Sequence, residues 1–327
     1  MRVFQAAPRH HPVGKRGTAR LRVVYFIQSH GKDELLPRLV RTLLAGSPEA
    51  LIIIGHDQCV GPIDRAILPP SGDIRVRPRD EPVRRGEFSC LEPYLEAAAA
   101  LRDADEQFDW LVYLSGQDYP VRPVSEIERT FATGDVDGFV RYWDVLSPDS
   151  PWGTKRAIRR YFYRWRRLPD WFRLPLKLVK AFRYVLPIET SFVYGVHLGT
   201  RLREPPFDGR FRCFGGSQWQ SLSRPAVELL VDALRERPDL VDYFRQSLVP
   251  DEALVQTVLI NSGRLRLAND NRRFTDTEER EKGHARVLVT DDFDRLTDGS
   301  FDFARKFDPV LSRELLDRLD AVVHAQA

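Results

Sequence analysis

The chain has 327 residues, of which 43% are hydrophobic and 30% are charged, so global disorder is excluded. Its formal net charge of +3 is too small to indicate nucleic-acid binding by itself. The cysteines Cys59, Cys90 and Cys213 are far apart and form no C-x-x-C pair. This spacing fits a reducing compartment and argues against a disulfide framework or a zinc site. No membrane-spanning run is expected, and residues 1–19 are expected to form a flexible basic arm.

The first 145 residues alternate between short apolar runs and amphipathic segments. We expect strands at 21–29, 50–54, 74–77, 110–114 and 139–143, and helices at 33–44 and 88–102. The first strand, helix and second strand form a βαβ unit, whose two strands are parallel. The alternation predicts an α/β fold in which a mostly parallel central sheet is flanked by helices.

A basic aromatic segment follows at residues 150–185. Between Lys155 and Tyr184 there are eleven basic residues and one acid, Asp170, with eight aromatic residues interleaved. The segment could bind an anionic or lipid-linked acceptor, an anionic membrane face or single-stranded nucleic acid. It could also be a solvated basic helix with aromatic residues packed beneath it. Nucleic acid is the least favoured of these, because no recognition motif is present.

The remainder of the chain contains three further predicted helices and two short strands. The helices are expected at 225–235, 252–259 and 312–323, and the strands at 265–267 and 287–290.

Four short segments carry candidate functional residues, whereas the P-loop, dinucleotide-binding, zinc-protease and serine-hydrolase motifs are absent from the sequence. Two of them follow predicted strands, where ligands bind in open α/β sheets. The candidates are His56 and Asp57 after the second strand, Gln117 and Asp118 in SGQDYP, Gly216, Ser217, Gln218 and Trp219 in CFGGSQW, and Asp251 and Glu252 in PDE. Taken singly, each segment is also explained as a turn, a helix cap or a helix first turn.

Taken together, these segments resemble the core-2/I-branching family of glycosyltransferases, which includes peptide O-xylosyltransferases. The matching pieces, in order along almost the whole chain, are VYFIQSHGKDELLPRLVRTL, GHD, LSGQDYPVRPVSEI, GGSQWQSLSRPAVELL, VPDEALVQTVLINS and FARKFD. The resemblance implies a GT-A-like nucleotide-sugar fold and an inverting, metal-independent enzyme without a cofactor. It also implies a UDP-sugar donor, for which we expect UDP-GlcNAc, with UDP-xylose as the alternative.

The resemblance also suggests roles for particular residues. Glu252 becomes the general base, and Asp251, one position away on the same turn, is its rival and is otherwise placed with the acceptor. Lys306, Arg305 and, by a looser match, Arg286 become cations for the diphosphate, where positive charge stabilises the leaving group. The donor side is completed by His56, Asp57, Gln117 and Asp118, and the acceptor side consists of Gly216, Ser217, Gln218 and Trp219.

The chain departs from the family pattern in two places. Arg85-Gly86-Glu87 stands where members commonly have a Trp-Gly-Gly-like segment. The D-x-D metal motif is missing from the SGQD position, and we interpret its matches at 135–137 and 292–294 as surface turns and caps. Because the sequence also shows neither the membrane anchor nor the disulfides of eukaryotic members, we expect a bacterial-type cytoplasmic enzyme, and a peripheral position on the inner face of the membrane stays open.

We therefore expect one GT-A-like domain over residues 20–327. Its donor half covers about 20–145, the basic segment 150–185, and the acceptor and base half 186–327. The partners are a UDP-sugar and a glycan acceptor, with a lipid-linked glycan and an anionic membrane surface as further candidates, and no nucleic acid. Two other hypotheses remain, a non-catalytic carbohydrate- or nucleotide-binding module and a peripheral membrane scaffold.

Overall fold

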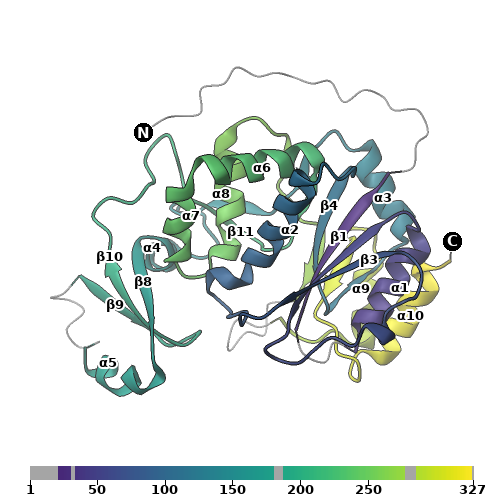
Figure 1. Ribbon diagram of the computed structural model, residues 1–327, viewed down its shortest axis with the longest axis horizontal. Coiled ribbons are helices and arrows are strands. Elements are labelled where there is room, and N and C mark those ends of the chain that lie inside the picture. The colour runs from purple at the N-terminus through teal and green to yellow at the C-terminus, as the bar shows by residue number, and fades with distance from the viewer. Residues whose placement is uncertain (1–20, 31–33, 180–186, 277–284, 326–327) are drawn as a thin grey trace.

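The computed structural model describes residues 21–30, 34–179, 187–276 and 285–325. A seven-stranded sheet forms its centre, with strand order β13-β6-β12-β4-β1-β2-β3 (Figure 1). The strands are β1 (Val23–His30), β2 (Leu51–Asp57), β3 (Asp73–Arg79), β4 (Trp110–Ser115), β6 (Gly138–Phe139), β12 (Ser221–Ser223) and β13 (Leu267–Ala268). All neighbours are parallel except β12, which runs antiparallel to both β4 and β6. The expected α/β fold with a mostly parallel sheet is therefore confirmed.

Strand β1 explains why the sheet is covered on both faces. Its residues 23–27 are fully buried, and they alternate between two hydrophobic cores. Val24 and Phe26 pack with α2 (Glu92–Asp103), α6 (Arg224–Glu236) and α8 (Leu254–Ser262). Tyr25 packs on the opposite face with α1 (Leu36–Gly46), α3 (Val124–Thr133) and α10 (Arg313–Val323). Because successive side chains of a strand point to opposite faces, a sheet with two covered faces needs a continuous apolar run.

Ten α-helices and five 3-10 turns are present in the described residues. The helices are α1 (Leu36–Gly46), α2 (Glu92–Asp103), α3 (Val124–Thr133), α4 (Thr154–Tyr161), α5 (Arg173–Val179), α6 (Arg224–Glu236), α7 (Pro238–Arg245), α8 (Leu254–Ser262), α9 (Phe293–Leu296) and α10 (Arg313–Val323). The 3-10 turns are η1 (Arg65–Ile67), η2 (Phe88–Cys90), η3 (Asp170–Phe172), η5 (Pro250–Glu252) and η6 (Thr290–Asp292). Within this part of the chain, every helix falls short of the length and apolarity that crossing a membrane requires.

Three smaller sheets surround the central one. They are β8 (Tyr163–Leu168), β10 (Val196–Arg201) and β9 (Ile188–Ser191); β14 (Arg273–Thr275), β15 (Phe303–Arg305) and β5 (Asp118–Pro120); and β11 (Phe214–Gly216) with β7 (Tyr142–Asp144). The first of these sheets, together with α5, projects from the body at the lower left of Figure 1. The basic segment thus contains a helix, a strand and a second helix over 154–179, and its residues 180–185 lie outside the described residues.

Two predicted strands differ from the structure. The strand expected at 139–143 is divided between β6 and β7, which belong to different sheets. The strand expected at 287–290 is wrong, because the chain there is irregular and then turns into η6. The carboxylate of Asp292 accepts a hydrogen bond from the Val289 N–H at 2.8 Å, which favours a turn over a strand ladder. The expected arm at 1–19 lies outside the described residues.

Candidate active site

The carboxyl end of β4 is followed by a tight turn that is folded around the carboxylate of Asp118. The Ser115 N–H donates to one oxygen of this carboxylate at 2.9 Å, and the Ser115 hydroxyl donates to the other at 3.0 Å. Asp118 is 1% exposed, and its partner across the fold is Arg305, whose Nε lies 3.0 Å from Oδ1. The pairing of β15 with β5 places these two residues opposite each other. Two residues that were predicted to bind the donor are therefore brought together.

Arg305 also connects the predicted donor and acceptor residues. Its guanidinium lies over the ring of Trp219, 4.2 Å from the ring centroid. Trp219 in turn meets Tyr113 edge-on, with ring centroids 5.0 Å apart. An arginine stacked on an indole and paired with a buried carboxylate is held in one orientation, as a site for an anion requires.

A hydrogen-bonded group of polar side chains lies beside this stack. The Gln218 amide donates to the Tyr113 hydroxyl at 2.8 Å, and that hydroxyl donates to the side chain of Gln28 at the end of β1. Burial, together with the nearby charge of Asp251, raises the pKa of Tyr113 well above its usual value, so the phenol stays protonated. Gln28 and Tyr113 were not among the predicted site residues.

A second residue outside the predicted set is Arg273, which lies behind the stack. It is 6% exposed, its guanidinium lies 4.4 Å from the ring centroid of Phe303, and burial lowers its pKa to about 10. The charges of Asp118 and Asp302 oppose that shift. Among the described residues its Nε and Nη1 have no hydrogen-bond partner. A buried guanidinium with unused donors adds positive charge to this region.

The predicted base region lies at η5. The Arg160 guanidinium donates to Glu252 Oε2 at 2.8 Å, and about a third of the Glu252 side chain is exposed. Arg160 is itself stacked on Trp152, 4.6 Å from the ring centroid. The Glu252 carboxylate is therefore both accessible and fixed in orientation.

Asp251 is the buried neighbour of Glu252. It is 8% exposed, and within the described structure its Oδ1 has no hydrogen-bond partner. Burial, and then the negative charge of Glu252, raise its pKa from 3.8 to about 7. The two adjacent carboxyl groups thus occupy different environments, as expected for neighbours about 120° apart on the 3-10 turn η5.

The loop that departs from the family pattern supports this turn. The Val249 N–H donates to the Gly86 carbonyl at 2.8 Å, three residues before Glu252. Gly86 has a φ of 77°, and a Cβ there would lie 2.4 Å from the ring of Tyr194. Glycine is therefore required at this position both by its conformation and by the close approach of the ring.

His56 and Asp57 are buried and have polar partners within the chain. The His56 ring nitrogens hydrogen-bond with the Ser29 hydroxyl at 2.7 Å and the Gly61 carbonyl at 2.8 Å. Asp57 accepts hydrogen bonds from the backbone N–H groups of Cys59 and Val83. Both residues organise the loops after β2 and β3, and their contact with a donor stays a prediction.

Lys306 and Gln117 lie beside the Asp118 turn. The Phe307 N–H donates to the Gln117 carbonyl at 3.0 Å, and in the part of the chain that is described the Lys306 ammonium has no ion pair. Arg286 differs, because its guanidinium binds Asp276 at 2.8 Å and Asp292 at 2.7 Å. Its role at the diphosphate stays a prediction and would have to compete with these two carboxylates.

Gly216 and Ser217 are held between β11 and α8. A Cβ on Gly216 would lie 1.8 Å from the backbone oxygen of Arg141. The Gln256 amide donates to the Ser217 carbonyl at 2.6 Å, and the Asn271 amide donates to the Ser217 hydroxyl at 2.8 Å. These contacts fix the backbone that presents Gln218 and Trp219.

Aspartates of both D-x-D matches bind arginine residues of this chain. Asp135 pairs with Arg266, Asp137 accepts the Arg266 N–H at 2.8 Å, and Asp292 binds Arg286. No group of three or more His, Cys, Asp or Glu residues suited to a metal ion is found in the described ranges.

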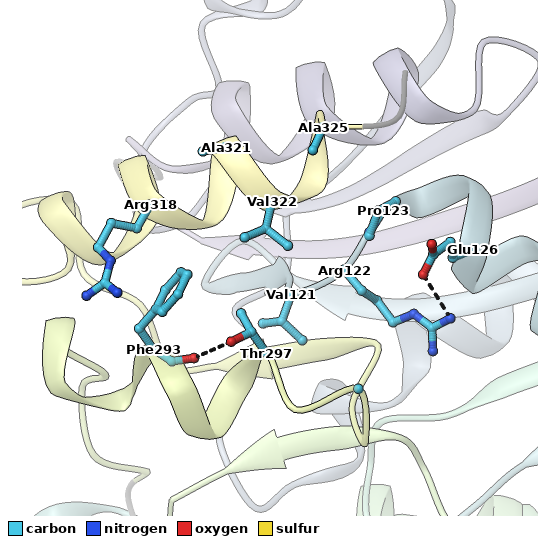
Figure 2. Close-up of a pocket in the computed structure, with 11 residues that line it drawn as sticks. Val121, Arg122, Pro123, Glu126, Phe293, Thr297, Arg318, Ala321, Val322 and Ala325 are labelled. Carbon is cyan, nitrogen blue, oxygen red and sulfur yellow. Dashed lines mark hydrogen bonds and ion pairs between the residues drawn. The ribbon is translucent and has the colours of Figure 1, made fainter.

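Cavities lie beside the candidate site rather than within it. One of about 830 Å³ lies between the start of α3, α9 and α10, and Figure 2 shows Arg122, Phe293 and Arg318 around it. Another, of about 460 Å³, lies between the 81–92 loop and β8, and its lining includes Trp165. Neither cavity contains a residue that was predicted for the site.

The chain is similar to several curated glycosyltransferases. It is 27% identical over 238 residues to beta-glucuronosyltransferase GlcAT14B of Arabidopsis thaliana, which covers 70% of this chain and 49% of the relative. It is 22% identical over 328 residues to xylosyltransferase oxt of Drosophila pseudoobscura pseudoobscura, which covers 93% of this chain and 33% of the relative. The chain therefore spans half or less of the length of these relatives.

Solved structures give weaker matches. S. aureus TarS 1–349 in complex with UDP has a TM-score of 0.25 at 11% identity, covering 36% of this chain and 34% of that chain. HddC from Yersinia pseudotuberculosis has a TM-score of 0.29 at 12% identity, covering 64% and 79%. The fold class consequently rests on the sheet topology described above. A family model for the Core-2/I-Branching enzyme matches residues 70–296, and the chain belongs to this family of glycosyltransferases.

Proposed function

We propose that the protein transfers a sugar from a UDP-sugar to a hydroxyl group of a glycan, with inversion and without a metal ion. The observation that carries the proposal is that Arg305 connects predicted donor and acceptor residues. Its Nε lies 3.0 Å from the Asp118 carboxylate, and its guanidinium lies 4.2 Å from the ring centroid of Trp219. Fixed cations and an accessible carboxylate are the two kinds of group that such a transfer requires.

In the proposed reaction Glu252 accepts the proton of the acceptor hydroxyl as its oxygen attacks the anomeric carbon. The new C–O bond forms while the bond between that carbon and the phosphate oxygen breaks, so UDP leaves with the bonding electrons. One displacement needs one base and leaves no covalent sugar–enzyme intermediate. Arg160 supports this role, because it holds the Glu252 carboxylate in place at 2.8 Å.

The departing diphosphate gains negative charge, and fixed cations stabilise it. Arg305 and Lys306 are the proposed contacts, with the buried charge of Arg273 behind them. Arg286 is a weaker proposal because two carboxylates bind it. For the donor we propose UDP-GlcNAc first and UDP-xylose second. The names of the relatives add UDP-glucuronic acid as a third donor to test.

The test is UDP release from these three donors, with a panel of glycan acceptors, in the presence and absence of EDTA. Glu252→Gln keeps the size of the side chain and an acceptor for Arg160 but removes the base. We expect EDTA-resistant release from one donor, reduced about 10²- to 10⁴-fold in this variant. Glu49→Gln is the matched control, because Glu49 is exposed and distant in sequence from the proposed site.

Binding of UDP by calorimetry separates loss of the base from loss of the site. Glu252→Gln should bind UDP as the wild type does. Turnover within tenfold of the wild type would refute the role of Glu252, and release that stops with EDTA would refute metal independence. UDP binding without turnover of any donor would favour a non-catalytic nucleotide-binding module.

A further inference from the structure

The projecting part of the molecule consists of β8, η3, α5, β9 and β10. We call it the arm, and it is distinct from the flexible basic N-terminus expected at residues 1–19. It is an antiparallel sheet of order β8-β10-β9 with α5 along its outer end (Figure 1). One face of β8 turns toward the body, where Trp165 is 4% exposed and its indole N–H donates to the Arg159 carbonyl at 2.9 Å. The free end of the arm therefore has a surface that the body does not cover.

Large apolar side chains are exposed on η3, on α5 and in the turn between β9 and β10. Trp171, Leu174 and Val193 are 69%, 72% and 68% exposed. They come from two segments that are in contact, because the Arg173 guanidinium lies 5.8 Å from the ring centroid of Phe192. Single exposed apolar residues are common, but three from adjoining segments, one of them a tryptophan, are typical of an interaction surface.

The same elements of the arm also carry exposed positive charge. Arg164 and Arg166 are exposed on the face of β8 opposite to the buried Trp165, and Arg173 and Lys177 are exposed on α5. From Tyr163 to Lys177 the single acidic residue is Asp170. The arm thus combines exposed apolar side chains with an excess of positive charge on β8 and α5.

We propose that the arm docks the protein on an anionic lipid bilayer. The head-group region of such a bilayer is negatively charged, which complements the cations, and tryptophan prefers this depth because its ring is apolar and its N–H is polar. A glycan would instead require paired polar groups around an aromatic face, and single-stranded nucleic acid would require several stacking faces. At the free end Trp171 and the half-buried Phe172 are stacked on each other, 3.8 Å apart.

The docked arm would also bring the base toward the lipid surface. Tyr194, next to Val193, packs against Gly86, and the Gly86 carbonyl binds the Val249 N–H. Glu252 follows three residues later. This geometry suits an acceptor that is held at a membrane. That inference about the acceptor rests on the proposed function, whereas the docking of the arm on a bilayer does not.

The test is sedimentation of the full chain with vesicles of phosphatidylcholine alone, or of phosphatidylcholine mixed with phosphatidylglycerol. The wild type should bind the anionic vesicles, and more weakly as salt increases. Arg173→Ser with Lys177→Ser should weaken binding about thirtyfold, since each cation near the surface contributes about 1 kcal/mol. Trp171→Ser with Leu174→Ser should weaken it by about tenfold or more.

The matched control is Val310→Ser with Leu311→Ser, which removes two side chains that are 68% and 64% exposed on a different part of the molecule. Circular dichroism establishes that each variant is folded. The control should bind like the wild type. Absence of binding to anionic vesicles, or equal losses in the control, would overturn the proposal. So would a dimer in gel filtration that Trp171→Ser with Leu174→Ser dissociates, because the surface would then bind a second copy of the chain.

Discussion

Replacing Asp251 with asparagine should change how the stability of the protein depends on pH. The carboxyl group of Asp251 is 8% exposed, and burial together with the charge of Glu252 raises its pKa from 3.8 to about 7. Asparagine has nearly the same shape but does not titrate. The difference between the two proteins therefore isolates the ionisation of this one group.

The sign and size follow from proton binding. Below pH 4 the carboxyl is protonated in both the folded and the unfolded chain, so its ionisation has no effect. Between pH 4 and pH 7 the folded protein keeps a proton that the unfolded chain has lost, so stability falls by about 1.4 kcal/mol per pH unit. A change from pH 5 to pH 8 crosses the part of this window between pH 5 and pH 7, which is two pH units. The free energy of unfolding of the wild type should therefore fall by about 3 kcal/mol more than that of Asp251→Asn.

The measurement is urea unfolding of both proteins at pH 5 and pH 8. Comparing the two changes, rather than two stabilities, cancels the effect of the buried amide and of titrating groups that do not interact with Asp251. Glu252→Gln is an informative third protein, because it removes the second cause of the raised pKa and should shrink the loss. Equal changes in wild type and Asp251→Asn between the two pH values would refute the reasoning.

Two further predictions concern the diphosphate contacts and the GGSQW segment. Lys306→Ala should weaken UDP binding about ten- to hundredfold in calorimetry, because a hydrogen bond to a charged group contributes about 1.5–3 kcal/mol; unchanged affinity would contradict its role at the diphosphate. Gly216→Ala should lower the Tm by several degrees, because the new Cβ would lie 1.8 Å from the Arg141 carbonyl oxygen and the backbone has to move; an unaltered Tm would contradict this packing.

The elements that could be predicted from the sequence are those that carry a long pattern of their own. The buried strands β1, β2 and β4 are continuous apolar runs, and α6 and α10 have clear apolar faces. The short strands β5 and β15 could not be recognised, because each has three residues and is defined by its pairing with the other across most of the chain. Helix α3 was not predicted, although Val124, Ile127 and Phe131 have helical spacing.

The candidate site was predictable to the extent that a motif carries its residues. Asp118, Trp219 and Arg305 come from three separate motifs and meet in the structure. Gln28 and Arg273 lie outside the motif residues that were chosen, and their positions depend on contacts across 85 residues or more. A local sequence pattern does not predict such contacts, so only the folded chain reveals them.

The two glycines of the GGSQW segment explain how the predicted acceptor loop and the base depend on each other. A Cβ on Gly215 would lie 2.3 Å from the ring of Trp152, so this ring can pack there only because the residue is glycine. Trp152 supports the Arg160 guanidinium at 4.6 Å, and Arg160 binds Glu252 at 2.8 Å. A side chain at Gly215 would displace Trp152 and loosen the arginine above it. The orientation of the base on η5 is therefore set partly by a glycine on β11. For this reason the two segments act as one unit, although some 36 residues separate them in the chain.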